Sequence, residues 1–160
     1  FDKRITTLYS TRDNIRKAVA QADLVVGAVL LPGRAAPKLL RREDLSIMKP
    51  GAVVVDVAVD QGGCVETTHP TTHDDPIFTV DGIVHYCVAN MPGAVARTST
   101  LALVNATMPY GLELAEKGFA ACSEDPGLLA GLNCCRGKCT FPGVAEALGL
   151  EYTDPAAALG

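Results

Sequence analysis

The sequence lacks the segments that would direct a protein into or across a membrane. No run of about 18 apolar residues occurs, so no membrane-spanning helix and no membrane partner are expected. Neither a signal peptide nor an initiator methionine is present at Phe1, and we expect the sequence to begin partway through a longer protein. Six cysteines in 160 residues are too few for a disulfide scaffold, which favours reduced thiols and a cytoplasmic location.

An excess of positive charge is also absent. The sequence has 14 lysines and arginines and 18 aspartates and glutamates, which gives a net charge of −4. A protein that binds the phosphate backbone broadly needs many cationic side chains, so no nucleic-acid partner is expected. Hydrophobic residues make up 48% of the chain, which is sufficient for a folded core, and the length allows one domain or two small ones.

Two almost entirely apolar segments are the strongest structural signal that is present. Residues 24–30 and 52–58 do not alternate between apolar and polar side chains, which is typical of parallel strands buried on both faces. A short β-prone run at residues 5–9 precedes them. A helix is predicted over residues 11–20, and a short helix or two turns over residues 38–48. The order strand, helix, strand, helix, strand predicts an α/β fold with a parallel sheet.

The second half of the sequence has a different character. Asp81-Gly82 separates two β-prone runs, residues 77–80 and 83–88, and predicts a β-hairpin. After Pro92-Gly93 the apolar residues recur with helical spacing. Three helices are predicted there, over residues 98–117, 126–132 and 142–148. We therefore place a boundary near residue 96, between an α/β part and an all-helical part.

Ligands of open parallel sheets bind beyond the carboxyl ends of the strands. The predicted strands place four loops at such ends, which are residues 10–11, 30–33, 59–63 and 88–92. No Gly-x-Gly-x-x-Gly motif follows a strand, and no Walker motif occurs. If residues 5–9 are the third strand of the order 3-2-1-4-5-6, we expect the first two strands and the glycine loop to precede Phe1.

Several longer motifs carry a resemblance to a known family. They are residues 6–10 (TTLYS), 27–33 (GAVLLPG), 48–51 (MKPG), 56–63 (DVAVDQGG) and 85–95 (HYCVANMPGAV), followed by Arg97-Thr98-Ser99-Thr100. In this order they resemble the carboxyl-terminal part of alanine dehydrogenase. The resemblance implies a partial Rossmann-type doubly wound parallel sheet in residues 1–96, as the second half of an NAD-binding domain. It implies an α-helical segment of the substrate domain in residues 97–160.

The resemblance also implies an activity and its site. Alanine dehydrogenases oxidatively and reversibly deaminate L-alanine to pyruvate and ammonia with NAD as hydride acceptor, usually as homo-oligomers. By match to the family motifs, Ser10 is expected at the adenosine end of NAD, and Asp60 at the nicotinamide and substrate as the catalytic aspartate. The other residues implied to contact the cofactor are Val29, Leu30, Val57, Val88, Asn90 and Met91.

Several parts of the family's active site are not in this sequence, so we predict that the chain alone is inactive. The glycine loop, the acidic residue that reads the adenine ribose, and the catalytic histidine with its substrate-binding arginine and lysine would all precede Phe1. The 160-residue chain alone should therefore bind NAD poorly and catalyse nothing. Alanine-dependent reduction of NAD by the pure chain, followed by absorbance, would contradict this prediction.

Other functions stay open at this stage. The NAD-binding component of proton-translocating transhydrogenase and lysine-forming saccharopine dehydrogenase share the same domain plan, although residues 85–95 disfavour both. A different class is a non-catalytic nucleotide-binding module or a relic of a degraded gene. Asp60 could also be a turn residue, since aspartate is common at the ends of strands.

The histidines and cysteines allow weaker alternatives. His69 and His73, with Asp74 and Cys64 nearby, could bind a metal, but Pro70 argues against a helix that aligns the two histidines, and no metal site is predicted. The cluster of Cys134, Cys135 and Cys139 could bind a metal or form a redox pair; surface thiols or a partly buried turn are the simpler interpretation.

Three further residues are interpreted as structural. Asp56 lies within an apolar strand and is expected to be hydrogen-bonded, because an unpaired buried charge is too costly. His85 is expected to be a strand histidine with a backbone partner. Cys87 is expected to be a small core residue.

Overall fold

The structure is a computed structural model that describes residues 5–160 and divides into two compact units. Unit 1 holds the described residues up to Leu30, together with Ala35–Met91. Unit 2 holds Leu31–Arg34 and Pro92–Gly160. The change of unit between residues 91 and 92 lies close to the boundary expected from the sequence, which was at residue 96.

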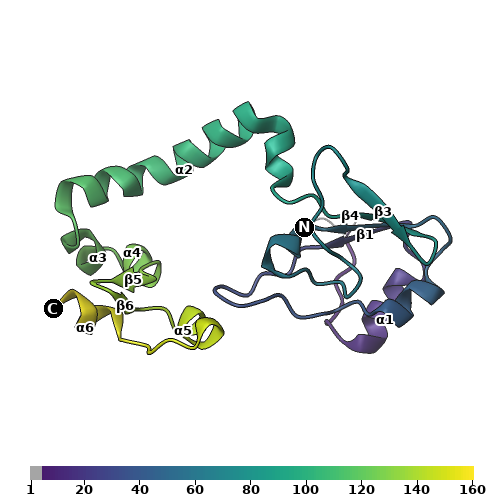
Figure 1. Ribbon diagram of the computed structural model, residues 1–160, viewed down its shortest axis with the longest axis horizontal. Coiled ribbons are helices and arrows are strands. Elements are labelled where there is room, and N and C mark those ends of the chain that lie inside the picture. Colours follow the sequence, from purple (N-terminus) through teal and green to yellow (C-terminus); the bar gives the residue numbers. More distant parts are fainter. Residues whose placement is uncertain (1–4) are drawn as a thin grey trace. The chain divides into compact units, whose positions relative to one another are not determined.

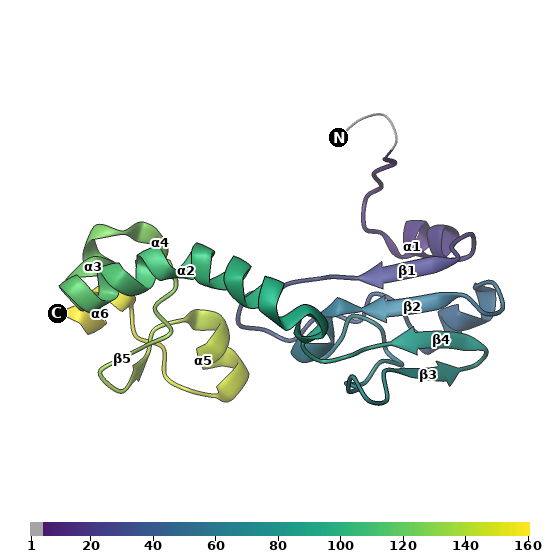
Figure 2. The ribbon, with the colours of Figure 1, turned by 90° about the horizontal axis from the view of Figure 1, so that it is seen from above.

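Unit 1 is built on a four-stranded sheet in the order β1-β2-β4-β3 (Figures 1 and 2). Its strands are β1 (Leu24–Gly27), β2 (Val53–Asp56), β3 (Ile77–Val80) and β4 (Ile83–Tyr86). β2 pairs in parallel with both β1 and β4, whereas β3 is antiparallel to β4. The predicted α/β class with a parallel sheet is confirmed.

The hairpin between β3 and β4 is also confirmed. Asp81 and Gly82 have φ angles of 49° and 81°, and these left-handed conformations are those of a type I′ turn. Positive φ at both turn residues matches the twist of the flanking strands, which explains why the Asp-Gly pair is a reliable signal.

The first predicted strand, residues 5–9, does not form. These residues have no regular secondary structure and are exposed, with Tyr9 89% accessible. β1 pairs with β2 along one edge, and no strand among residues 5–160 pairs with its other edge. A β-prone segment needs a hydrogen-bonding partner to become part of a sheet, and the described chain offers residues 5–9 none.

The first predicted helix is confirmed as α1 (Arg12–Val19). Thr11 caps it, because the Thr11 hydroxyl oxygen accepts from the backbone N–H of Asn14 at 3.2 Å. Arg12 and Arg16 of this helix form ion pairs with the buried carboxylate of Asp44. Burial alone would raise the pKa of Asp44, but the backbone N–H of Arg41 and the guanidinium of Arg12 lower it below its usual value.

The second predicted helical segment, residues 38–48, is shorter than expected. Only Arg42–Ile47 is helical, as the short 3-10 helix η1. The preceding backbone pairs with a distant segment instead, since Leu39 N–H donates to Cys64 O at 2.8 Å and Leu40 O accepts from Glu66 N–H at 2.8 Å. These long-range bonds replace the bonds that a helix over residues 38–41 would make.

The core of unit 1 lies against the sheet. Its fully buried apolar side chains include Leu45, Val54, Val65 and Ile83. By contrast, Leu24 and Val26 of β1 are 58% and 56% exposed. The buried core therefore lies mainly against β2 and β4, whereas β1 is more exposed to solvent.

Unit 2 is predominantly helical, as predicted. The short 3-10 helix η3 (Met91–Val95) leads into the long helix α2 (Ala96–Lys117), which contains Pro109. The remaining helices are α3 (Ala120–Glu124), α4 (Pro126–Ala130), α5 (Pro142–Leu148) and α6 (Pro155–Leu159). A two-stranded hairpin of β5 (Cys134–Cys135) and β6 (Lys138–Cys139) lies among them and was not predicted. No helix among residues 5–160 is long and apolar enough to cross a membrane.

Candidate functional site

The carboxyl ends of the three parallel strands define one edge of the sheet in unit 1. The register pairs Gly27 of β1 with Asp56 of β2, and Val55 of β2 with Tyr86 of β4, so the three strands end together. The loops that follow carry most of the residues implied to contact a cofactor. A ligand at this edge would meet all three loops, as in other open parallel sheets.

Asp56 organises the loop after β2. Its Oδ1 accepts from the backbone N–H of Ala58 at 3.1 Å, and its Oδ2 accepts from the N–H groups of Cys64 and Val65 at 2.9 and 3.2 Å. The hydroxyl of Thr68 donates to the same Oδ2 at 2.6 Å. The side chain is fully buried, so the expectation of a hydrogen-bonded structural carboxylate is confirmed.

The bonds of Asp56 turn the end of the predicted strand into a helix. Residues 57–61, part of which was predicted as strand, form the 3-10 helix η2 (Val57–Gln61), with Asp56 as its N-cap. Gly62 ends η2 in the left-handed conformation with a φ of 90°. A carboxylate at a strand end that accepts from the next turn is the physical reason for the shorter strand.

The helix η2 presents Asp60 to solvent. Ala58 and Val59 are buried and fix the helix on the core, whereas Asp60 is exposed and Val57 is 49% exposed. Asp60 therefore has an anchored backbone and an exposed carboxylate beyond the carboxyl end of β2. This arrangement suits a group that must receive a proton or orient a water molecule at a bound ligand.

Lys38 secures the turn that follows η2, a role that the sequence did not indicate. Its ammonium donates to the carbonyl oxygens of Gly62 and Gly63, the latter at 2.8 Å, and lies 3.3 Å from that of Val65. No spacing in the sequence links Lys38 to a turn 24 residues away, so only the folded chain reveals this contact.

The loop after β4 holds three of the implied cofactor residues in different environments. Val88 is 1% exposed and belongs to the buried interior of unit 1. Asn90 is exposed with a φ of 56°, a conformation in which asparagine is enriched, and its carbonyl accepts from Nε2 of His73 at 3.2 Å. Met91 is half-buried and begins η3.

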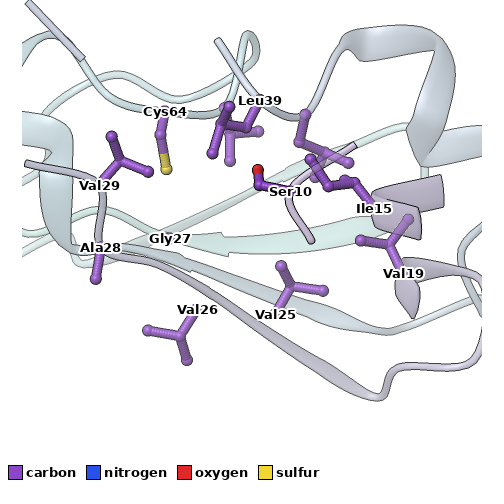
Figure 3. A pocket seen from close by; sticks show the side chains of 12 residues that line it. Ser10, Ile15, Val19, Val25, Val26, Gly27, Ala28, Val29, Leu39 and Cys64 are labelled. Atoms are coloured by element: carbon purple, nitrogen blue, oxygen red, sulfur yellow. The ribbon is translucent and has the colours of Figure 1, made fainter. Parts of the chain in front are cut away.

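A cavity of about 300 Å³ lies between β1 and α1. Its wall includes Ser10, which is implied to lie at the adenosine end of NAD, and Val29, which is implied to contact the cofactor. The rest of the wall is mainly aliphatic, with the thiol of Cys64 and the hydroxyl of Ser10 as its polar side-chain groups (Figure 3). The other implied residues, Leu30 among them, do not line this cavity.

His85 is a fully buried polar residue of β4. Its Nδ1 lies 3.0 Å from Ile83 O and its Nε2 lies 2.8 Å from the hydroxyl of Thr67, so a neutral ring donates to the carbonyl and accepts from the hydroxyl. The ring stacks on Phe78, which stacks in turn on His69, with centroid distances of 5.0 and 4.0 Å. The expected backbone partner is confirmed.

The buried His85 should make stability depend on pH. Burial lowers its pKa from 6.5, so the folded state favours the neutral ring more than the unfolded state does. Its contribution is therefore complete above pH 6.5 and is lost as the pH falls through the lowered pKa. Urea unfolding of the wild type and of His85→Gln should show a free-energy gap that narrows below pH 6.5. A gap that widens there would contradict the assignment.

The residues considered for a metal site are separated in the fold. His69 stacks on Phe78, whereas His73 bonds the carbonyl of Asn90. Cys64 is buried, with its thiol 3.5 Å from Asp56 Oδ1. No group of three or more metal-binding side chains occurs among residues 5–160. Cys87 is fully buried as expected, and burial raises its pKa to about 11, which keeps it a thiol.

Replacing Gly63 in the turn after η2 with any larger residue should lower the free energy of unfolding. Its φ is 74°, and an added Cβ would lie 2.5 Å from Thr68 Oγ1 and 2.8 Å from Asp56 Oδ2. Gly82 has a similar φ of 81° but open space around it. Gly82→Ala should therefore cost about 1 kcal/mol of unfolding free energy, and Gly63→Ala about 3 kcal/mol. Equal losses in the two variants, measured by urea unfolding, would show that the crowding around Gly63 has no effect.

The fold and the strand-end loops define an α/β domain of the dinucleotide-binding type, and comparison with known proteins gives its family. Residues 1–142 match the family described as "Alanine dehydrogenase/PNT, C-terminal domain". The chain belongs to this family.

Individual relatives agree with the family match. The chain is 58% identical to the alanine dehydrogenase of Halomonas elongata, over 100% of this chain and 43% of the relative. It is 55% identical to that of Mycolicibacterium smegmatis, over 98% of this chain and 42% of the relative. The chain thus spans less than half the length of the curated relatives it matches.

Solved structures support the same relationship. An L-alanine dehydrogenase structure superimposes with a TM-score of 0.76 at 50% identity, covering 93% of this chain and 41% of that one. A transhydrogenase from Sinorhizobium meliloti gives a TM-score of 0.52 at 35% identity, over 57% of this chain and 26% of that one. The likeness to the alanine dehydrogenase is therefore both closer and more complete.

Proposed function

We propose that the protein containing this chain catalyses the reversible oxidative deamination of L-alanine to pyruvate and ammonia with NAD. The observation that carries the proposal is identity of 52–58% to several alanine dehydrogenases along almost the whole chain. The exposed carboxylate of Asp60 on its anchored helix η2 gives the proposal a chemical group in the expected place.

We propose that NAD binds along the carboxyl ends of β1, β2 and β4. The cavity of about 300 Å³ with the hydroxyl of Ser10 and the side chain of Val29 in its wall suits the adenine ring of adenosine, which has flat apolar faces and edges that hydrogen-bond. The exposed side chains of Leu30 and Val57 lie on the loops that follow β1 and β2 and offer apolar surface to the cofactor. Val88, Asn90 and Met91 would contribute the loop beside the nicotinamide.

In this proposal NAD, when bound, supplies the acceptor for the hydride that leaves Cα of alanine. The carboxylate of Asp60 accepts a proton from the water that attacks the oxidised substrate carbon, or orients that water. Asp56 and Lys38 hold η2 and its turn so that Asp60 keeps its place. We propose that residues 1–96 belong to the NAD-binding domain and residues 97–160 to the substrate domain.

A substrate panel tests the proposed function. The protein expressed from its complete coding sequence is incubated with NAD and either L-alanine or another amino acid, and NADH is followed by absorbance. L-Alanine should give NADH and pyruvate in equal amounts, and pyruvate with ammonia should reoxidise NADH. Hydride transfer between NADH and an NADP analogue without alanine turnover would favour a transhydrogenase, and turnover of saccharopine would favour the other alternative.

The assembly and location are further parts of the proposal. Helix α2 exposes a series of large apolar side chains, which include Leu101, Leu103, Met108 and Leu112, and such a surface favours a homo-oligomer. The six free cysteines suit the reducing conditions of the cytoplasm. Analytical ultracentrifugation of the whole protein tests the first point.

A further inference from the structure

Two cysteines of unit 2 lie directly opposite each other in the β5–β6 hairpin. The antiparallel register pairs Cys134 with Cys139 and Cys135 with Lys138. The turn between the strands consists of Arg136 and Gly137, with φ angles of 50° and 78°, which is the two-residue type I′ connection. This turn fixes the register, so Cys134 and Cys139 are held opposite each other by the backbone.

The position of the pair in the ladder brings its side chains close. Opposing residues in an antiparallel ladder alternate between hydrogen-bonded and non-hydrogen-bonded pairs, and the pair that flanks a two-residue turn is hydrogen-bonded. One step beyond the cysteines, Thr140 N–H donates to Asn133 O at 2.8 Å, which marks the next hydrogen-bonded pair. Cys134 and Cys139 are therefore the non-hydrogen-bonded pair, with Cα atoms about 4.5 Å apart.

This geometry lies within the range for a disulfide. Bridged cysteines have Cα atoms about 4.4–6.8 Å apart and Cβ atoms on the same side of the ladder. Both thiols are free in the structure, and the Cys139 thiol lies 3.7 Å from Phe141 O. A rotation about the Cα–Cβ bonds can join them without moving the backbone.

The neighbouring cysteines do not compete for the same bond. Cys135 points to the opposite face of the hairpin, because successive strand residues alternate, and its buried thiol lies 3.6 Å from Ala158 O. Cys122 is buried within α3. Cys134 is exposed and can react with a reagent from solution, whereas its cross-strand partner Cys139 has only 6% of its surface accessible.

We propose that Cys134 and Cys139 form a reversible thiol-oxidation site that reacts with low-molecular-weight disulfides such as oxidised glutathione. The Cys134 thiolate attacks one sulfur of the reagent, which forms a mixed disulfide and releases one glutathione thiolate. The Cys139 thiolate then attacks Cys134 Sγ, which forms the cross-strand bond and releases the second glutathione thiolate. The two cysteine protons pass to the two released thiolates, and two electrons pass from the protein to the reagent.

Tryptic mapping tests the site, because two cleavage points lie between the cysteines. Trypsin cuts after Lys117, Arg136 and Lys138, so Cys134 and Cys139 fall in separate peptides, residues 118–136 and 139–160. The purified protein is equilibrated with oxidised glutathione, quenched in acid, alkylated, digested and analysed by mass spectrometry. The two peptides should appear joined, lighter by two hydrogens than their sum, and should separate after reduction with dithiothreitol.

Matched variants and fragmentation identify the bond. Cys134→Ser and Cys139→Ser should each lose the joined peptides, whereas Cys135→Ser should keep them. Fragment ions from the wild-type product locate the linked cysteines without relying on any variant. Separate peptides that carry only glutathione, or a bond through Cys135 or Cys122, would overturn the proposal.

Discussion

Asp60→Asn should lower kcat for alanine oxidation by about 10²–10⁴-fold, the usual contribution of a positioned general acid or base. The side chain is exposed and accepts no hydrogen bond that stabilises η2 from residues 5–160, so the same variant should change the free energy of unfolding by less than about 0.5 kcal/mol. An amide has nearly the shape of the carboxylate but cannot accept the proton. Steady-state rates of NADH formation and urea unfolding measure the two effects.

Asp23→Asn is the matched control for this prediction. Asp23 is also exposed, and it precedes β1, at the opposite end of the strands from the proposed site. The control should retain the wild-type rate, which excludes a general effect of removing one surface charge. A similar kcat in Asp60→Asn and the wild type would show that Asp60 has no part in the chemistry.

Asp56→Ala should destabilise the protein by about 3–5 kcal/mol, the largest stability effect that we expect. The carboxylate accepts bonds from three backbone N–H groups and the hydroxyl of Thr68, all within a buried loop. Alanine would leave these donors without partners and remove the N-cap of η2. Urea unfolding of the purified variant measures the loss.

Asp56→Asn refines the same prediction. An asparagine can keep one acceptor oxygen for Cys64, Val65 and Thr68, but its NH₂ group then faces the N–H of Ala58. The cost should therefore be intermediate, about 2 kcal/mol. Comparing the Asp56 variants with Asp60→Asn distinguishes the roles of two aspartates four residues apart. Asp56 is structural, and Asp60 is proposed to act in the reaction. An Asp56→Ala variant as stable as the wild type would show that the network does not hold the loop.

Patterns that depend on local chemistry were predicted correctly from the sequence. The apolar runs identified β1 and β2 as parallel strands, but the expected burial on both faces does not hold for β1, whose Leu24 and Val26 are exposed. Asp81-Gly82 identified the β3–β4 hairpin because the type I′ turn requires positive φ at both positions. Thr11 identified the start of α1 because its hydroxyl bonds within the first turn.

Features that depend on distant partners were not predicted. Residues 5–9 have β propensity but no strand to pair with in the described chain, and residues 38–41 bond to the segment around Cys64 instead of forming a helix. The contacts of Lys38 with the turn after η2 and of Thr68 with Asp56 have no periodicity that a sequence pattern could reveal. For the candidate site, the motif match suggested the residues, and the fold places most of them on the loops that follow β1, β2 and β4.

The central claim is that NAD binds at the carboxyl ends of β1, β2 and β4, and hydrogen–deuterium exchange of the protein from its complete coding sequence tests it most directly. Saturating NADH should slow amide exchange in residues 28–31, 57–62 and 88–91 and leave the β5–β6 hairpin unchanged. NADH that binds tightly but leaves exchange in all three loops unaltered would contradict the claim.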